Sequence, residues 1–255
     1  MIEIPRYPKE FQLSRENQYY EYLKNKRVIV VGPADYLVGQ GKGAEINGYD
    51  VIVRLNLGCP VPEQLKPDIG SRTDVLYHVV MAQRQIRKNP DVIKPHSREQ
   101  IQSWKEDGLQ WFISKRSTEQ NRVRKLARLI SGEISWMTIP IPNMRRLEVI
   151  LRTNPNMGTV AIWHVLQSQA KSLYVTGCDF HRTGYHVGYG GFTAEQAAKG
   201  AGSVTCWGQV PQPVKRAQNM HDVDKQLKYL ALLRLRDKRF KADEVLSKML
   251  DEVVL

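Results

Sequence analysis

The sequence predicts an α/β protein of Rossmann-like type, in which a mostly parallel sheet is flanked by helices. Three observations predict it. Short β-branched runs, such as residues 28–31 and 51–53, have the length and composition of buried strands. Segments with helical periodicity alternate with these runs along the chain. Turns rich in glycine and proline separate the two kinds of segment. Strands that alternate with helices favour a parallel sheet covered on both faces.

The chain has 255 residues, which is long enough for one α/β domain with a full hydrophobic core. No internal repeat, low-complexity tract or Gly/Ser-rich linker divides it, so we expect a single domain over residues 1–255. The three cysteines lack metal-ligand spacing, and their odd number is typical of a reducing compartment. There is neither a signal-peptide pattern nor a long apolar run. We therefore expect a cytoplasmic protein.

The net charge of +12 admits nucleic acid, an anionic membrane or an anionic small molecule as a partner. The basic residues concentrate in two helix-patterned segments, 116–128 and 234–241. No aromatic RNA-binding module and no helix-turn-helix pattern accompanies them, so we expect no nucleic-acid partner. An anionic sugar nucleotide explains the charge, and so does peripheral association with an anionic membrane surface.

The first predicted element is an amphipathic helix over residues 14–25, within a helical lead-in that spans residues 1–26. Ser14 is its predicted N-cap. Tyr19 and Leu23 fall on one helical face, which predicts that they are packing residues.

A buried strand over residues 28–31 follows and stops at Gly32-Pro33, and a second strand is predicted over residues 50–56. Three glycines lie between the two strands: Gly39, Gly41 and Gly43. The backbone N–H groups of such a loop can approach a phosphate closely. Open α/β sheets build nucleotide sites in this way at the carboxyl ends of their strands. The glycine spacing alone leaves a nucleotide site and a plain turn equally open.

The middle of the chain continues the alternation of strands and helices. We predict strands over residues 74–80, 111–113 and 136–140. We predict a surface excursion with a short helix over residues 83–107 and a basic amphipathic helix over residues 119–130. His78 is predicted to be a buried histidine in its strand or at the strand's end.

Residues 154–161 open a helix that runs to about residue 170, and a strand over residues 173–177 follows. The free N–H groups of this helix start suit a phosphate or a carboxylate, although an ordinary capped helix has the same pattern. A loop with glycines at 188, 190 and 191 comes next, and the last predicted helix covers residues 219–236.

Four blocks of the chain resemble glycosyltransferase family 29, the eukaryotic-type sialyltransferases. Residues 30–56, VVGPADYLVGQGKGAEINGYDVIVRLN, followed by DIGSRT at 68–73, resemble the large sialyl motif of that family. Residues 154–177 resemble its small motif. His186 best matches the histidine of the third motif, with His181 second. His221, followed by an aspartate, resembles the short final motif.

The resemblance implies a GT-A-variant, sialyltransferase-like fold and an inverting, metal-independent glycosyltransferase. Its donor would be a CMP-activated acidic sugar, either sialic acid or a Kdo-like sugar, and its acceptor a glycan or glycolipid hydroxyl. No cofactor is implied, because the CMP-sugar is itself a substrate. His221 is implied as the general base, and His186 as the donor of a hydrogen bond to the leaving CMP phosphate. The implied donor-binding residues are Gly32, Pro33, Ala34, Asn56, Asn156, Met157, Gly158, Thr159 and Gly177.

Two further patterns point to other chemistry. The pair Asp222 and Asp224 could bind a divalent cation, but both lie at a helix start where acidic residues are expected as caps, so we predict no metal. A nicotinamide dehydrogenase would need Gly-x-Gly-x-x-Gly directly after the first strand, and the glycine spacing here differs.

Four positions depart from the motifs at expected contact sites: Pro33, Asn156, Met157 and Gln226. They support an alternative function, a sialyltransferase-like protein that binds a nucleotide or glycan with impaired catalysis. The sequence leaves the acceptor, the linkage, the exact donor sugar and the oligomeric state open.

Overall fold

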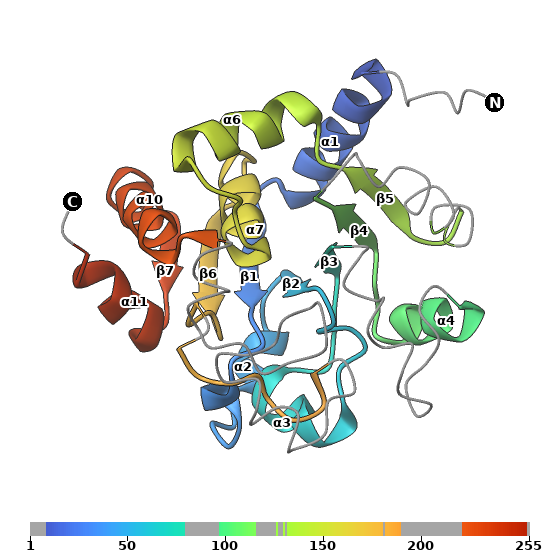
Figure 1. The fold of residues 1–255 in the computed structure, drawn as a ribbon. Coiled ribbons are helices and arrows are strands. Elements are labelled where there is room, and N and C mark those ends of the chain that lie inside the picture. The colour runs from blue at the N-terminus through green and yellow to red at the C-terminus, as the bar shows by residue number, and fades with distance from the viewer. Residues whose placement is uncertain are drawn as a thin grey trace, which may run out of the picture.

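A computed structural model describes residues 9–79, 97–115, 126, 130, 132–180, 182–189 and 221–253. Within these residues seven strands form one sheet in the order β5-β4-β3-β2-β1-β6-β7, and every neighbouring pair is parallel. This confirms the predicted α/β fold (Figure 1). The strands are β1 (Arg27–Val31), β2 (Val51–Leu55), β3 (Val75–His78), β4 (Trp111–Ser114), β5 (Ser135–Thr138), β6 (Ser172–Thr176) and β7 (Phe240–Ala242).

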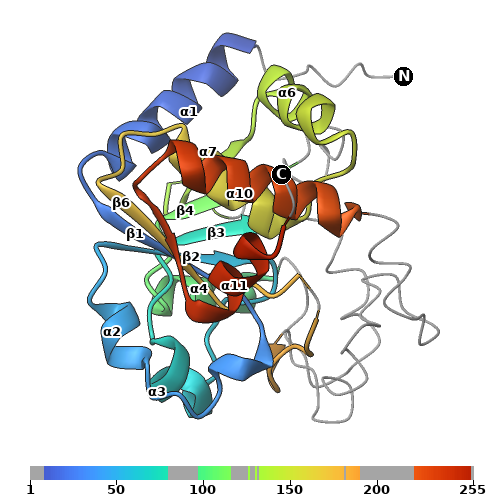
Figure 2. The ribbon, with the colours of Figure 1, turned by 90° about the vertical axis from the view of Figure 1, so that its left-hand side faces the viewer.

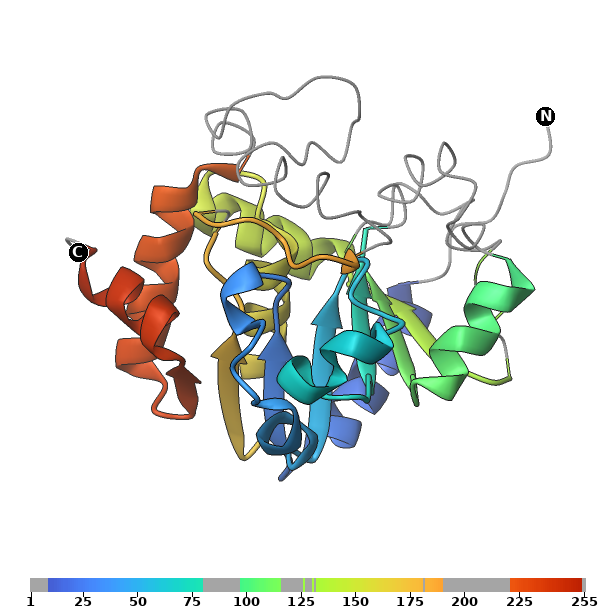
Figure 3. The ribbon, with the colours of Figure 1, turned by 90° about the horizontal axis from the view of Figure 1, so that it is seen from below.

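Helices cover both faces of the sheet, as Figure 2 shows. The first face carries α1 (Lys9–Leu23), α6 (Ile141–Leu151), α7 (Met157–Leu166), α10 (Val223–Arg236) and α11 (Glu244–Asp251). The second face carries α2 (Gly43–Asn47), α3 (Lys66–Ile69) and α4 (Arg98–Glu106), with the short 3-10 turns η1 (Asp35–Leu37) and η2 (Glu63–Leu65). Seen from the side in Figure 3, the two layers enclose the strands.

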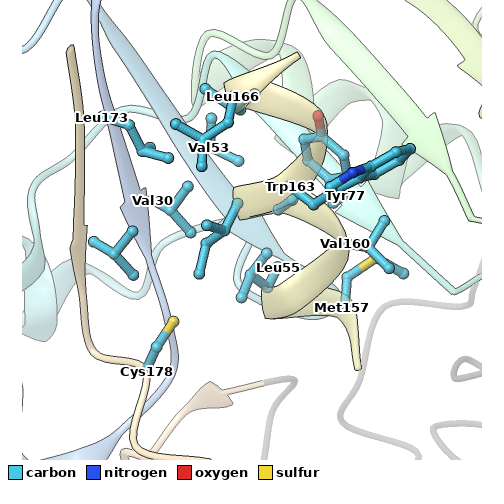
Figure 4. Close-up of a cluster of buried hydrophobic side chains, with 14 of the residues drawn as sticks. Val30, Val53, Leu55, Tyr77, Met157, Val160, Trp163, Leu166, Leu173 and Cys178 are labelled. Atoms are coloured by element: carbon cyan, nitrogen blue, oxygen red, sulfur yellow. The ribbon is translucent and has the colours of Figure 1, made fainter. Parts of the chain in front are cut away.

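The first face buries the largest core, at whose centre lies α7. Figure 4 shows Val160 and Trp163 of this helix in one cluster with Val30 and Val53, which come from β1 and β2. The alternate residues Ile29 and Ile52 point to the second face and pack with α2 and α3. Because both faces are covered, the central strands are largely apolar, as is usual for parallel sheets; Arg27 of β1 and Arg54 of β2 are the exceptions.

The N-terminal helix belongs to this core. Tyr19 and Leu23 are fully buried, which confirms that they are packing residues. The predicted N-cap at Ser14 is wrong, because α1 already begins at Lys9. The preceding residues Lys9 to Leu13 are themselves good helix formers, so the helix extends past the serine.

A chain of buried polar groups ties α1 to α7. The Glu16 carboxylate lies 3.0 Å from His164 Nε2, and His164 Nδ1 lies 2.8 Å from the Tyr77 hydroxyl. That hydroxyl is 3.1 Å from the hydroxyl of Tyr19. Asn143 of α6 donates to both oxygens of Glu16. These side chains satisfy one another inside a core that would otherwise leave each polar atom unpaired.

Several predicted elements match and others were missed. His78 is buried at the end of β3, as predicted. The basic helix predicted over residues 119–130 lies almost wholly outside the described residues, as do Gly190, Gly191 and His181. The sequence reading missed α6, β7 and α11.

Candidate active site

The order in which the chain adds strands to the sheet reverses at β1. From β1 the strands proceed in order through β2, β3, β4 and β5 to one edge, while β6 and β7 lie on the other side of β1. In open α/β sheets, ligands bind outside the carboxyl ends of the strands at such a point. Gly32 follows β1 here, Gly177 follows β6 and Asn56 follows β2, so these three predicted donor-binding residues lie on one edge.

Gly32 and Gly177 pack directly against each other. The N–H of Gly32 donates to Thr176 O at 2.8 Å, and the N–H of Ala34 donates to Gly177 O at 3.1 Å. A Cβ on Gly32 would lie 2.1 Å from Gly177 O, and Gly177 has a φ of +70°. Both positions therefore require glycine so that the two strand ends can meet.

Gly177 is also bound by Tyr36 of η1 and by Asp243, which follows β7. Its N–H donates to the Tyr36 hydroxyl at 2.8 Å and to Asp243 Oδ2 at 3.2 Å. The same carboxylate oxygen accepts from the hydroxyls of Tyr36 and Thr176, at 2.6 and 2.7 Å. These hydrogen bonds fix the carboxyl ends of β1, β6 and β7 relative to one another.

The glycine loop between β1 and β2 is fastened to α3. The N–H of Gly41 donates to Asp68 Oδ1 at 2.8 Å. Hydrogen bonds from the N–H groups of Gly39 and Gly41 lower the pKa of Asp68. A Cβ on Gly43 would lie 2.2 Å from Lys66 O. N–H groups that we expected to face a ligand are thus bound to a carboxylate of the protein.

Asn56 joins the ends of β2 and β3. Its φ is +50°, a conformation that asparagine adopts more readily than most residues. Its N–H donates to Tyr77 O at 2.7 Å, and its side-chain oxygen accepts from the N–H of Val79 at 3.0 Å. The side-chain NH₂ group has no acceptor among the described residues, so it can donate to a ligand at this edge.

The start of α7 lies over the same strand ends. Asn156 is the N-cap, and its side-chain oxygen accepts from the N–H of Thr159 at 2.8 Å. A Cβ on Gly158 would lie 3.7 Å from Leu55 of β2 and 3.8 Å from Cys178, which follows β6. The N–H groups of Met157 and Gly158 have no acceptor among the described residues. Two backbone donors and the positive end of the helix dipole therefore meet at the carboxyl edge, an arrangement that suits an anion.

Gln226 connects the start of α7 to the start of α10. Its buried side-chain oxygen accepts from the N–H of Asn156 and from the hydroxyl of Thr159, both at 2.8 Å. Its NH₂ group donates to His221 O. An amide can accept and donate at once, whereas a carboxylate only accepts. The amide of Gln226 is therefore matched to its three partners.

His221 is held by the segment that precedes α7. Its Nδ1 lies 2.8 Å from Asn154 O. A carbonyl oxygen can only accept a hydrogen bond, so Nδ1 carries the proton. In the neutral ring the lone pair is then on Nε2, the nitrogen that could accept a proton from a substrate.

Lys115, directly after β4, supports the same segment from behind. Its buried ammonium donates to the side chain of Asn154 at 2.7 Å and to Pro155 O. The residue whose carbonyl binds His221 is thus fixed to the end of a strand. His221 and Asn56 therefore lie at the same carboxyl edge of the sheet.

The segment 182–189 lies across the ends of β1 and β2. The N–H of His186 donates to Pro33 O at 3.0 Å, and the hydroxyl of Tyr189 donates to Leu55 O at 3.2 Å. Pro33 therefore has its carbonyl bound within the protein. The segment brings His186 to the edge that carries the predicted donor-binding residues.

The ring of His186 is buried, and its Nδ1 lies 3.3 Å from Val187 O. Burial lowers its pKa, and the positive charge of the nearby Arg54 lowers it further. The ring is neutral near pH 7, with its proton on Nδ1 and a lone pair on Nε2. In this state Nε2 accepts a hydrogen bond and does not donate one.

The structure brings together the starts of two helices and the ends of three strands that the motifs suggested separately. Sequence reasoning missed Lys115, Tyr36 and Asp243. Lys115 gave a usable signal, because it is a charged residue directly after the buried run Trp111 to Ser114. Tyr36 and Asp243 gave none, since their contact joins positions more than 200 residues apart in sequence.

The aspartate pair next to His221 is engaged as a helix cap. Asp222 accepts from the N–H of Lys225 at 3.2 Å and pairs with its ammonium at 2.6 Å, while Asp224 is exposed. In the described part of the chain, no three His, Cys, Asp or Glu side chains gather as ligands of a metal would. Of the helices that the structure describes, none combines the length and the apolar character needed to cross a bilayer.

The chain is an α/β protein with a candidate ligand site at the carboxyl edge of its parallel sheet, and comparison with known proteins specifies it further. The sequence pattern of glycosyltransferase family 29 (sialyltransferase) matches residues 3–140. The chain belongs to this family. The match contains the ends of β1 and β2 and stops before the segment that holds His221. Comparison with curated protein sequences gives no match.

Solved structures show the same fold. A crystal structure of a mammalian sialyltransferase aligns with a TM-score of 0.50 at 12% identity, over 95% of this chain and 81% of that one. A second structure, of a mammalian sialyltransferase in complex with Gal-beta-1-3GalNAc-ortho-nitrophenol, aligns with a TM-score of 0.50 at 11% identity and the same coverage. At these identities the likeness concerns the fold.

Proposed function

We propose that this member of the family transfers an acidic sugar from a CMP-activated donor to a glycan hydroxyl, with inversion and without a metal ion. In this reaction the acceptor oxygen bonds to the anomeric carbon, and the bond from that carbon to the phosphate oxygen breaks. The acceptor's proton passes to a base, and CMP leaves with the bonding electron pair. A single displacement of this kind inverts the anomeric centre.

The orientation of His221 carries the proposal. Because Asn154 O holds the proton on Nδ1, Nε2 has the lone pair that a general base needs. His221 also lies directly before Asp222, the N-cap of α10, where positive backbone N–H groups disfavour an imidazolium. Both features favour the neutral ring that can take a proton from an attacking alcohol.

The start of α7 is the proposed anion-binding part of the site. The N–H groups of Met157 and Gly158 and the helix dipole suit the donor's phosphate or carboxylate. The NH₂ group of Asn56 would donate from the neighbouring strand end. Thr159 contributes indirectly, because its buried hydroxyl is already committed to Gln226.

Hydrogen-bond donation from His186 to the leaving phosphate stays a prediction, and it requires a change in the protonation of the ring. The ring must gain a second proton, since Nδ1 already faces Val187 O. An arriving phosphate supplies the negative charge that raises an imidazole pKa. Donor binding and protonation of His186 should therefore be coupled.

Replacement of His221 tests the base. His221→Ala should reduce sugar transfer by about 10²–10⁴-fold, the usual contribution of general-base catalysis, with CMP affinity nearly unchanged. His221→Asn keeps a donor for Asn154 O and should be equally inactive. Asp224→Ala, in the exposed next turn, is the matched control and should retain activity. Full transfer activity in His221→Ala would rule out the base.

Calorimetric titration with CMP, CDP, UMP and NAD tests the donor class. We expect CMP to bind most tightly. Tight CMP binding without transfer to any acceptor in a glycan screen would favour the alternative of a catalytically impaired binding protein. Preference for NAD or UMP would refute the donor assignment. The acceptor is proposed to be a glycan or glycolipid, and cytoplasmic location stays a prediction.

A further inference from the structure

Apolar side chains are exposed on two neighbouring helices of the first face. Val149 and Ile150 of α6 are 74% and 48% exposed, and Leu232 and Leu235 of α10 are 38% and 57% exposed. They are half of the large hydrophobic residues exposed in the part of the chain that the structure describes. The two helices pack against each other, and Figures 1 and 2 show them side by side. We call these four residues with their flanking cations the α6–α10 face.

Arg146 of α6 and Tyr229 of α10 interact electrostatically between the two apolar pairs. Burial raises the pKa of Tyr229, and the charges of Arg146 and Arg236 oppose the rise. On α6, Ile150 is four residues from Arg146 and so lies on the same side of the helix. On α10, Leu232 is three residues from Tyr229. The exposed apolar side chains therefore form one surface across the helix pair.

The α6–α10 face is also strongly basic. Its exposed cations have no ion-pair partner among the described residues: Arg145, Arg146, Arg152, Lys228 and Arg236. Residues 141–152 hold three arginines against one glutamate, and residues 223–236 hold four cations against one aspartate. Aliphatic side chains among unpaired cations are the pattern of a surface that lies on an anionic bilayer. The aliphatic groups enter the boundary with the acyl chains, while the cations stay with the headgroups.

Charge separates this partner from a second copy of the chain. A two-fold dimer through the α6–α10 face would bring the same unpaired cations together from both copies, which is unfavourable. An anionic lipid surface complements them instead. We propose that the α6–α10 face docks the protein on a membrane rich in anionic phospholipid.

Docking in this way would place the candidate site close to the lipid. The helix α6 ends shortly before Asn154, whose carbonyl holds His221, and α10 begins next to His221. A lipid-linked glycan would then reach the carboxyl edge from the membrane. This last step rests on the proposed function, whereas the docking itself does not.

Vesicle sedimentation tests the docking. The intact protein should bind phosphatidylcholine vesicles rich in phosphatidylserine, should bind pure phosphatidylcholine vesicles far more weakly, and should dissociate as salt rises. The double variant Arg146→Gln/Arg236→Gln should weaken binding by about 30-fold, from about fivefold per cation near an anionic surface. Val149→Asn/Leu235→Asn should weaken it by about tenfold or more.

Matched controls lie elsewhere on the molecule. Arg98→Gln/Lys105→Gln removes the same charge from α4 on the second face, and Val38→Asn removes an exposed aliphatic side chain outside the α6–α10 face. Both should bind vesicles nearly as the intact protein does. Unchanged circular dichroism and melting temperature will show that each variant folds.

Three results would overturn the inference. Binding that does not depend on phosphatidylserine would refute it, and so would equal losses in the α4 control, because the charge would then act diffusely. A dimer that becomes a monomer in Val149→Asn/Leu235→Asn, without any vesicle binding, would make the face a contact between copies. Transfer to a soluble acceptor is measured separately. Its failure bears on the proposed chemistry and leaves the vesicle result to decide the docking.

Discussion

Gln226 offers the sharpest test of how the site is held together. Gln226→Leu keeps most of the side-chain volume but removes three hydrogen bonds, two accepted at 2.8 Å and one donated to His221 O. The hydroxyl of Thr159 is fully buried and would stay unpaired, at a cost of about 1–3 kcal/mol. The other two partners are partly exposed, so water can replace the lost bonds at about 0.5–1 kcal/mol each. We expect a total loss of about 2–5 kcal/mol in the free energy of unfolding.

Urea denaturation measures this loss. Gln167→Leu, an exposed glutamine at the other end of α7, is the matched control and should change stability by less than about 0.5 kcal/mol. Because Gln226 binds the backbone carbonyl of His221, the proposed base, sugar transfer should fall in Gln226→Leu even where the protein remains folded. A destabilisation below about 1 kcal/mol would refute the reasoning, since it would mean that the three bonds contribute little.

Three other substitutions test neighbouring features. Gly177→Ala should destabilise the fold by more than about 2 kcal/mol, measured in urea, because its Cβ would lie 2.6 Å from Gly32 O. The control Gly132→Ala has a φ of +85° but no atom within 4 Å, so it should cost only about 1 kcal/mol. Equal losses in the two variants would contradict the packing argument. Lys115→Met should lower sugar transfer and broaden the ring signals of His221 in NMR spectra, and unchanged spectra would show that Lys115 does not position this ring. The pKa of Asp68 is lowered in the folded protein, so its contribution to stability is present above the unfolded pKa of about 3.9 and is lost as pH falls through the folded value. Asp68→Asn should therefore lose less stability on acidification than the intact protein, and identical acid melting curves would contradict this.

The strands and their edge could be predicted because their signals are local. The β-branched run before Gly32 and the polar residue that ends the second strand mark the carboxyl ends of two strands, and a parallel sheet brings such ends together. The start of α7 was predictable for the same reason, since Asn156 and the glycine two residues later are a helix-start pattern.

The contacts that orient the candidate base could not be predicted. Asn154 and His221 are 67 residues apart in sequence, and nothing local in either segment indicates the other. The glycine loop, for which the sequence left a nucleotide site and a plain turn equally open, shows the same limit. Its N–H groups have the pattern of a phosphate cradle, but Asp68 of the protein lies opposite them and binds Gly41. A pattern specifies which groups are available, and only the tertiary fold decides which partner they bind.

The buried polar chain from Glu16 to Tyr19 has a practical consequence for any shortened form of the protein. Removal of α1 would take away both Glu16 and Tyr19. It would leave His164 Nε2 without its partner inside the largest core and leave the Tyr77 hydroxyl with its bond to His164 alone. A truncated protein that begins at β1, close to the start of the large motif, should therefore be insoluble. A version that starts at Lys9 retains all of α1 and with it every member of the polar chain.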